Sequence, residues 1–477
     1  MISIWSMDCT IPEREKLKQN LSVDTAVIGA GMVGILCAYF LQKQGQNVIV
    51  LEGNRIGSGV TQNTTAKITA QHRLFYDKLI KEFGKEKAGQ YAAANMDAID
   101  VFKKIIKDNN IDCNLEEKSA YVYSLNKTKN IENEVVAAKD LGIEAFYTDE
   151  TGLPFKVSAA VEFKNQAQFH PLKFIKAISE SLMIYEKTFV KTIEDNIIIT
   201  EDAKVSAKNI IVTTHYPFLN TPGYYFMRMH QERSYVLALQ NAGQVKGMYI
   251  DEDDKGYSFR NYGDLLLLGG AGHRTGENPM GGAYVNLREK ASCLYPNYKE
   301  VCCWSTQDCV SLDEIPYIGH YSKSTPNLYV ATGFKKWGMT SSMVSAMLLS
   351  DMICEKTNDY AEVFKPERFN IVAVSKNLVI DGAKSVSGLV SQIISLPDKV
   401  ITELKNGYGG IVDLNGEKIG AYKDDEGNVF TVSTKCTHLG CQLQWNPDEK
   451  SWDCPCHGSR FNYTGKLINN PAMEGIK

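Results

Sequence analysis

Residues 25–52 read TAVIGAGMVGILCAYFLQKQGQNVIVLE, and this stretch places a glycine pattern between two apolar segments. The pattern is G-x-G-x-x-G, formed by Gly29, Gly31 and Gly34. Hydrophobic periodicity predicts a strand, a helix and a second strand in that order, over Thr25–Ile28, Met32–Gln44 and Asn47–Leu51. Glu52 directly follows the second strand. Together these features form the βαβ fingerprint of a dinucleotide-binding domain.

Each part of this fingerprint has a physical role. Gly29 permits the tight turn, and Gly31 lets a pyrophosphate approach the backbone. The N-terminus of the following helix favours the negative charge of that pyrophosphate. Glu52 is expected to hydrogen-bond ribose hydroxyls. The motif alone leaves open whether the dinucleotide is FAD or NAD.

A second motif lies near the end of the chain, where CTHLGC (Cys436–Cys441) is followed by CPCHGS (Cys454–Ser459). Each hexapeptide offers one thiolate and one imidazole, and these groups suit both iron and zinc. The four candidate metal ligands are Cys436, His438, Cys454 and His457. A structural zinc site is the simpler alternative, but the spacing is not that of a zinc finger. A zinc ribbon would use Cys441 and Cys456 as ligands, which would leave both histidines surplus.

The two hexapeptides resemble the Rieske [2Fe–2S] family, in which one iron takes two cysteines and the other two histidines. The resemblance implies that the first cysteine of each hexapeptide binds one iron and the two histidines bind the other. It also implies a disulfide between Cys441 and Cys456 that ties the cluster loops together. Family members usually continue beyond Pro471–Ala472 with a closing strand. The resemblance therefore implies a module that is truncated at its C-terminus, with an open sheet edge.

The segment before the first hexapeptide, GGIVDLNGEKIGAYKDDEGNVFTVSTKC, alternates apolar and polar residues. Turns at Asn415–Gly416 and Glu426–Gly427 predict short antiparallel strands joined by hairpins. We therefore expect a small all-β Rieske domain over residues 408–477. A unit of this size usually needs covalent or metal staples, and a cluster with a disulfide would supply them.

Three further segments resemble the FAD-dependent D-amino-acid-oxidase-type family, which includes glycine and sarcosine oxidases and many amine dehydrogenases. RIGSGVTQNTTAK (Arg55–Lys67) follows the second strand, and DEIPYIG is at Asp313–Gly319. NLYVATGFKKWGMTSSMVSAMLLSDMI then predicts a strand, a glycine loop and a helix, over Leu328–Ala331, Gly333–Gly338 and Met339–Ile353. The resemblance covers roughly Ser22–Met352 and favours FAD as the dinucleotide.

This resemblance implies an α/β FAD-binding domain of the Rossmann-like, glutathione-reductase type, with an interleaved α+β substrate domain. Leu265–Leu268 is expected to be a buried strand of the substrate domain, after a hairpin turn at Asn261–Asp264. Contacts to the cofactor are implied beyond the glycine motif and Glu52. They involve Thr65, Lys67, Val190, Gly333, Gly338, Met339 and Thr340.

Candidate substrate residues follow from the same resemblance. Amino-acid-oxidising relatives often place an arginine after the PYIG segment, where its planar fork binds a carboxylate. His320 occupies that position here, which leaves amines and N-substituted compounds open as substrates. Arg260, on a predicted substrate-domain strand, is the alternative carboxylate ligand, or else part of a surface ion pair. Lys336 is expected near the flavin or the substrate, and His273 and Tyr235 are weaker candidates.

The 477 residues include 44% hydrophobic and 23% charged residues, and the net charge is −4. This composition is typical of a globular protein and offers no basic surface for nucleic acid. We find no apolar run of about 18 residues, the length of a membrane span. The N-terminal sequence lacks the pattern of a signal peptide, so a cytoplasmic protein is expected.

We expect an oxidoreductase unit over residues 1–355 and a partly helical linker over residues 356–407, before the Rieske module. The apolar stretch Val386–Ile394 of the linker is expected to pack on a neighbouring domain.

These features predict a flavin-dependent dehydrogenase that oxidises an amine or an amino-acid-like substrate. Electrons would pass from FAD through the cluster, one at a time, to a one-electron acceptor protein or a quinone. Two alternatives stay open. The cluster could instead feed the flavin, as in a reductase or an oxygenase component, or the protein could be a redox sensor.

The segment HGSRF generates a prediction about the reduction potential of the cluster. In respiratory Rieske proteins, a serine two residues after the last histidine and a tyrosine four residues after it donate hydrogen bonds to cluster sulfurs. Ser459 matches the first position, but Phe461 lacks the second hydroxyl. A hydrogen bond to a charged group contributes about 1.5–3 kcal/mol, or roughly 65–130 mV for one electron. Phe461→Tyr should therefore raise the potential, measured by redox titration, by tens of millivolts.

An unchanged potential, with the new hydroxyl seen in place beside the sulfur, would contradict this explanation.

Overall fold

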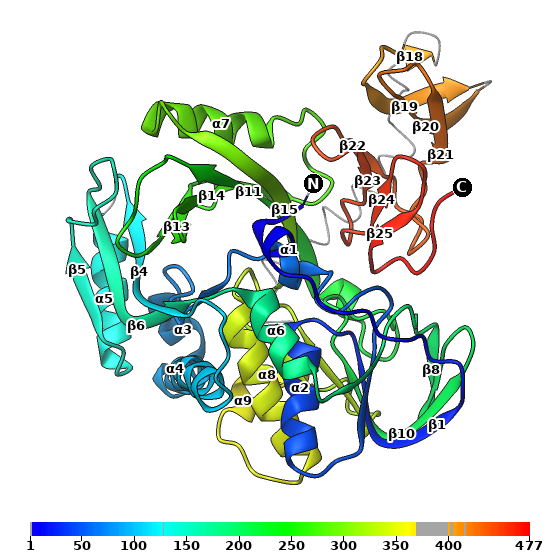
Figure 1. Cartoon of the computed structure of the whole chain (residues 1–477), viewed down its shortest axis with the longest axis horizontal. Coiled ribbons are helices and arrows are strands. Elements are labelled where there is room, and N and C mark those ends of the chain that lie inside the picture. Colours follow the sequence, from blue (N-terminus) through cyan, green and yellow to red (C-terminus); the bar gives the residue numbers. More distant parts are fainter. Residues whose placement is uncertain (1, 127, 369–398, 401–403, 415) are drawn as a thin grey trace.

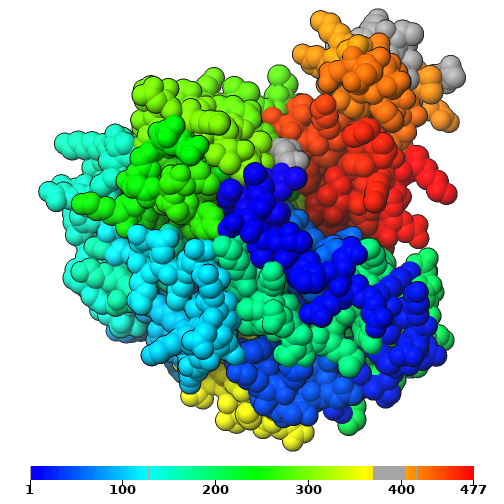
Figure 2. Space-filling view, in the orientation of Figure 1, coloured from blue at the N-terminus to red at the C-terminus, as the bar shows by residue number. Residues whose placement is uncertain are grey.

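The computed structural model describes residues 2–126, 128–368, 399–400, 404–414 and 416–477. A large N-terminal unit (residues 2–368) contains two sheets and most of the helices, and a smaller C-terminal unit (the described residues from 399 to 477) lies against it (Figure 1). Figure 2 shows the part of the C-terminal unit drawn in red in contact with the N-terminal unit, whereas the orange part projects outward.

The first sheet of the N-terminal unit contains the strands predicted around the glycine motif. Its order is β16-β17-β10-β1-β2-β7, and the hairpin β8-β9 pairs with β10. The sheet is parallel from β17 to β7, with β16 as an antiparallel edge. The bounds are β1 (Leu21–Ile28), β2 (Val48–Leu51), β7 (Met183–Tyr185), β8 (Thr192–Glu194), β9 (Ile197–Ile199), β10 (Lys204–Val212), β16 (Tyr317–His320) and β17 (Leu328–Thr332).

Two helices pack on this sheet and on each other, α2 (Met32–Lys43) and α8 (Gly338–Ile353), and α6 (Pro171–Ser179) packs on α2. The strands β2 and β17 are buried at every position, as expected for parallel strands covered on both faces. The predicted elements over residues 25–51 and 328–353 are therefore confirmed to within a few residues at their ends.

The glycine turn brings β1 and α2 very close together. Gly29 has φ +106°, a conformation that other residues rarely adopt. A Cβ atom on Gly34 would lie 1.9 Å from the carbonyl oxygen of Gly29 and 2.8 Å from Oγ1 of Thr213. Only glycine at position 34 therefore allows the helix to start this close to the strand.

The second sheet of the N-terminal unit has nine strands in the order β15-β11-β14-β13-β12-β4-β6-β3, and β5 pairs with β6. All pairs are antiparallel except β12 with β4. The bounds are β3 (Lys67–Ile68), β4 (Glu116–Ser124), β5 (Ala145–Thr148), β6 (Ala159–Gln168), β11 (Met229–Gln240), β12 (Met248–Asp251), β13 (Ser258–Tyr262), β14 (Leu265–Arg274) and β15 (Lys299–Ser311). This is the expected α+β substrate domain, including the hairpin before β14.

Helices cover this sheet at two places. α7 (Ala283–Leu294) packs on β11 and β14, and α5 (Lys129–Asp140) packs on β5 and β6. The helices α3 (Tyr76–Phe83) and α4 (Lys85–Asp108) pack on each other, and α4 also contacts α8. The sheet thus joins the dinucleotide domain through one shared hydrophobic core.

The C-terminal unit is all-β, as predicted, and consists of two four-stranded sheets. The first contains β18 (Lys399–Val400), β19 (Gly409–Leu414), β20 (Glu417–Lys423) and β21 (Val429–Ser433). The second contains β22 (Gln444–Asn446), β23 (Ser451–Asp453), β24 (Arg460–Asn462) and β25 (Leu467–Asn469). Trp452 is fully buried where the two sheets meet, and its ring lies 4.9 Å from that of Trp445.

The described part of the expected linker contains α9 (Ala361–Phe364) and the 3₁₀ turn η3 (Pro366–Arg368). The apolar stretch Val386–Ile394 lies outside the described residues. Among the described residues, no helix has the length and apolar character needed to cross a membrane.

Two helical glycines provide a test of the packing at the glycine turn. Gly34→Ala in α2 should lower the free energy of unfolding by about 1–3 kcal/mol or more, because the added methyl group overlaps the Gly29 carbonyl. Gly89→Ala in α4 is the matched control, since an added Cβ there meets no atom within 4 Å. That change should stabilise the protein by up to about 1 kcal/mol. Thermal and denaturant unfolding would measure both values, and equal effects of the two changes would contradict the packing argument.

Candidate functional site

A cavity of about 800 Å³ lies where the two sheets of the N-terminal unit meet the C-terminal unit. The glycine turn and the end of β2 line one part, and β11, β14 and β15 line another. The C-terminal unit contributes Glu449, Arg460 and residues of the segment from Leu467 to Met473. The cavity therefore has walls from both units, and Arg460, which directly follows the second hexapeptide, is part of its lining.

The dinucleotide end of the cavity is built from backbone groups around one carboxylate. Gly29, Gly31 and Glu52 line the cavity where α2 begins. The backbone N–H groups of Ala30 and Asn54 donate to Oε2 and Oε1 of Glu52, each at 2.7 Å. These bonds fix the carboxylate at the strand end, while burial raises its pKa. A glycine turn, a helix N-terminus and a fixed acid form a fitting cradle for a dinucleotide.

The other predicted cofactor residues divide into two groups. Thr65, Lys67, Val190, Gly338 and Met339 line the cavity.

Three others do not line it. Gly34 allows the close packing of α2, and Gly333 forms a turn with φ +79° beside Ser311. The hydroxyl of Thr340 donates to the carbonyl oxygen of Thr69 at 3.1 Å. These three residues support the segments that line the cavity without lining it themselves.

Arg260 corrects a prediction about the substrate. It lies on a substrate-domain strand, as expected, but it is 1% exposed and does not line the cavity. Its guanidinium donates to the carbonyl oxygens of Thr65 (2.7 Å), Ala66 (2.9 Å) and Asn261 (3.1 Å), and lies over the ring of Trp5. Its N–H groups hold the backbone of the cavity wall. Arg260 therefore neither binds a substrate carboxylate nor forms a surface ion pair.

His320 corrects a second prediction. It ends the edge strand β16, and its ring packs 4.9 Å from that of Tyr329 instead of lining the cavity. The residue that follows the PYIG segment is therefore not part of the cavity wall.

Lys336 does line the cavity, where its Nζ forms an ion pair with Oε2 of Glu232 at 2.7 Å. Tyr235 also lines it and donates to Nε2 of His273 at 2.9 Å. Nδ1 of His273 lies 2.8 Å from the carbonyl oxygen of Arg274, which fixes the proton on that nitrogen. Lys67 donates to the carbonyl oxygen of Tyr249, and burial lowers the pKa of Lys67 to about 7.

The two hexapeptides form paired loops, each closed by its own backbone hydrogen bonds. In the first loop, the N–H of Cys436 donates to the carbonyl oxygen of Cys441, and in the second the N–H of Cys454 donates to that of Ser459. A disulfide joins Cys441 to Cys456. The pairing that the Rieske resemblance implied is thus confirmed, and it holds the loops face to face.

The four candidate metal ligands face one another between these loops. Cys436 and Cys454 are buried free thiols, and the rings of His438 and His457 lie 5.0 Å apart. Nδ1 of each histidine is buried without a hydrogen-bond partner among the described residues, an arrangement that a metal bond would satisfy.

The electrostatics of the loops suit metal binding as well. Burial lowers the pKa of His438 to about 4 and that of His457 to about 3, so both imidazoles are neutral at pH 7. A hydrogen bond from Cys454 lowers the pKa of Cys436 to about 7, with help from backbone N–H groups. Sulfur atoms of Cys441, Cys454 and Cys456 also lie within 4.8 Å of one another, but two of them are used by the disulfide. The contact between Cys436 and Cys454 raises the pKa of Cys454, so one proton is shared by the two sulfurs. Two cysteine sulfurs and two neutral imidazoles are therefore available, the donor set of a Rieske cluster.

Ser459 and Phe461 are the residues expected to tune the cluster. Oγ of Ser459 accepts the N–H of Ala472 at 2.9 Å, and its hydroxyl lowers the pKa of Cys436 by hydrogen bonding. Phe461 is fully buried in the core of the C-terminal unit.

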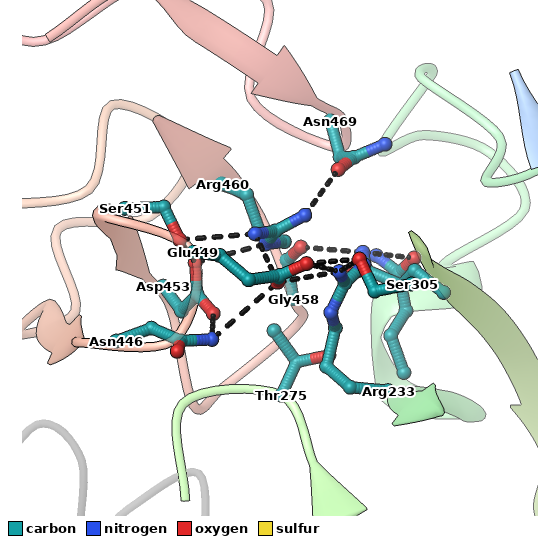
Figure 3. A network of polar contacts seen from close by, with 12 residues as sticks. Arg233, Thr275, Ser305, Asn446, Glu449, Ser451, Asp453, Gly458, Arg460 and Asn469 are labelled. Atoms are coloured by element: carbon teal, nitrogen blue, oxygen red, sulfur yellow. Dashed lines mark hydrogen bonds and ion pairs between the residues drawn. The ribbon is translucent and has the colours of Figure 1, made fainter. Parts of the chain in front are cut away.

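A buried charge network joins the two units at the edge of the cavity (Figure 3). Glu449 of the C-terminal unit forms ion pairs with Arg460 (2.5 Å) of the same unit and with Arg233 of β11, and accepts the hydroxyl of Ser305 in β15. Nε of Arg460 also pairs with Asp453 at 2.9 Å. Burial opposes the charged form, but the two guanidiniums outweigh it and lower the pKa of Glu449 to about 2. The sequence offered no signal for these contacts, since each residue resembles an ordinary surface charge.

The role of Arg260 can be tested against that of Lys336. Arg260→Lys loses the planar fork and leaves buried carbonyl groups without donors, at about 1–3 kcal/mol each. It should lower the melting temperature and the amount of flavin retained per chain. Lys336→Met changes a residue that lines the cavity directly. This variant should have a higher melting temperature than Arg260→Lys. A normal melting temperature and flavin content in Arg260→Lys would refute the wall-holding role.

The chain matches two family models. One, described as FAD dependent oxidoreductase (DAO), covers residues 24–352, and the other, described as Rieske [2Fe-2S] domain, covers residues 396–477. YhfW of Bacillus subtilis (strain 168), named as a Rieske 2Fe-2S iron-sulfur protein, is 38% identical over 99% of this chain and 96% of its own length.

Solved structures show the same fold in the N-terminal unit. Glycine oxidase from Geobacillus kaustophilus matches with a TM-score of 0.63 and 16% identity, over 73% of this chain and 100% of its own. L-proline dehydrogenase from P. horikoshii matches with a TM-score of 0.61 and 18% identity, over 73% and 98%. The chain therefore belongs to the DAO family of FAD-dependent oxidoreductases and carries a C-terminal Rieske [2Fe–2S] domain.

Proposed function

We propose that the protein is a dehydrogenase that oxidises a small amine or amino-acid-like molecule and delivers the electrons, one at a time, to an external acceptor. The observation that carries this proposal is the shared cavity, which residues of the Rieske domain and of the dinucleotide turn line together. When bound, FAD accepts two electrons as a hydride and the cluster transfers single electrons. A chain that holds both sites side by side is suited to converting a two-electron oxidation into one-electron steps.

The lining of the cavity supports a small polar substrate. Gly269 and Gly270 of β14 leave that wall without side chains, next to Tyr235. Lys336 and Lys67 place two amino groups at the same cavity, where they offer hydrogen-bond donors to a carboxylate. The fold neighbours glycine oxidase and L-proline dehydrogenase favour an amino-acid-like compound. The acceptor we propose is a one-electron carrier protein or a quinone.

An anaerobic screen of amines and amino acids tests the proposal. The expected result is loss of the flavin absorbance on adding substrate, followed by the electron paramagnetic resonance (EPR) signal of the reduced cluster. A flavin that is reduced only by an external electron-donor protein would instead identify a reductase or oxygenase component. A cluster that responds to redox conditions without any turnover would identify a sensor.

Removing one cluster ligand separates the two halves of the proposed reaction. Cys454→Ser deletes a thiolate and should abolish the cluster, measured as iron content. The flavin unit has its own core, so substrate should still bleach the flavin, while electron delivery to the external acceptor should fall to the background rate. Cys293→Ser, at an exposed free cysteine, is the control and should change neither property. Normal delivery by the cluster-free variant would show that the cluster lies off the path.

A further inference from the structure

Two buried glutamines connect the flavin cavity to the cluster loops. Gln231 lies in β11 and Gln307 in the paired strand β15, and they are 1% and 2% exposed. Gln307 lines the cavity, whereas Gln231 lies behind it. Neither residue belongs to the sequence motifs of the flavin site or of the metal centre, yet both side chains end at a cluster loop.

The amide groups form a continuous hydrogen-bonded bridge. Nε2 of Gln307 donates to the carbonyl oxygen of Gly458 at 2.8 Å and to Oε1 of Gln231 at 2.6 Å. Nε2 of Gln231 donates to the carbonyl oxygens of His457 (2.7 Å) and Asn470 (3.1 Å). One hydrogen bond therefore separates a residue of the cavity wall from the residue that follows a cluster ligand.

The cluster loop is shaped for this close approach. Gly458 has φ +82°, and a Cβ atom on it would lie 2.6 Å from Cβ of Gln231. Any other residue at position 458 would push the loop away from β11. The glycine that follows His457 thus lets the loop reach the flavin unit.

The second histidine ligand also faces the N-terminal unit. Nε2 of His438 lies 2.8 Å from Oδ1 of Asn220, and the ring of Phe226 contacts the rings of both histidines edge to face. The metal centre is therefore oriented with its histidine side towards the flavin unit.

We propose that Gln231 and Gln307 form the bridge for electron exchange between the flavin site and the cluster, an inference that rests on the proposed function. Electron transfer is faster through covalent and hydrogen bonds than across van der Waals gaps, and these bonds lie in a buried, low-dielectric region. Each transfer oxidises the flavin by one electron and reduces the cluster by one, and no bond within the bridge breaks. An external one-electron acceptor then reoxidises the cluster.

Other contacts hold the two units together, so docking alone does not require the bridge. Glu449 is buried between two arginines, and Oδ1 and Oδ2 of Asp448 accept the N–H groups of Gly282 and Ala283 at 3.0 Å, at the start of α7. Asn470 donates to two carbonyl groups of the N-terminal unit. Asp448 does not line the cavity and lies outside the cluster loops, which makes Asp448→Asn a matched interface control.

The test uses the holoprotein and needs no substrate. The flavin is reduced by a light flash with 5-deazaflavin, and its reoxidation is followed together with reduction of the cluster. Exchange within one chain is the phase whose rate does not change with protein concentration. Gln307→Met and Gln231→Met remove the amides while keeping similar length. Gln307→Met removes both routes to the cluster loop and should slow this phase most, whereas Gln231→Met leaves the Gln307–Gly458 hydrogen bond and should slow it less. Asp448→Asn should leave it unchanged.

Further measurements distinguish weaker electron transfer through the bridge from a loosened contact between the two units and from loss of folding. Hydrogen exchange of residues 220–228 and 457–461, the cluster EPR spectrum and both reduction potentials should match the wild type in the glutamine variants. If Gln307→Met loses FAD, Gln231→Met tests the same bridge without altering the cavity wall. A wild-type rate in the Gln231→Met variant, or slowing that comes with loss of hydrogen-exchange protection, would overturn the bridge. Absence of any such phase in the wild type would instead overturn the proposed function.

Discussion

The arrangement of the whole molecule depends on one carboxylate, that of Glu449, which is buried between arginines from opposite sides of an interface. Arg460 belongs to the same unit as Glu449, and Arg233 projects from β11 of the flavin unit. Removing a single partner from such a buried network leaves an uncompensated charge, which is far more costly than losing an exposed ion pair. The network therefore selects one docked orientation among those that surface contacts alone would allow.

That orientation determines which residues line the cavity. The segment from Leu467 to Met473 closes one part of it, and the strands β11 and β15 form the opposite wall and the support for the cluster loops. The fold of the N-terminal unit is shared with glycine oxidase and L-proline dehydrogenase, which are matched over 100% and 98% of their length by 73% of this chain. Fold alone does not specify chemistry, and what this chain adds to that shared fold is the Rieske domain at the cavity.

Sequence reasoning succeeded where the chemistry is local. The turn at Gly29 and the paired hexapeptides could be recognised because each motif carries its own backbone and ligand requirements within a few residues. It failed for Arg260 and His320, because their roles depend on which groups the tertiary structure places around them. Arg260 is on the predicted strand, yet its guanidinium meets backbone carbonyls of a segment almost 200 residues away in the chain. Glu449 could not be distinguished from any exposed acid, since its partner Arg233 is 216 residues away.

The covalent continuity of the two units has a kinetic consequence. When donor and acceptor sites are on separate proteins, their encounter slows as both are diluted. Here the two sites belong to one chain. Linking two domains typically gives each an effective concentration of about the millimolar range for the other. In the proposed reaction, exchange between the two sites is therefore insensitive to how much of the protein a cell makes. Only the supply of substrate and the encounter with the outside acceptor then scale with abundance.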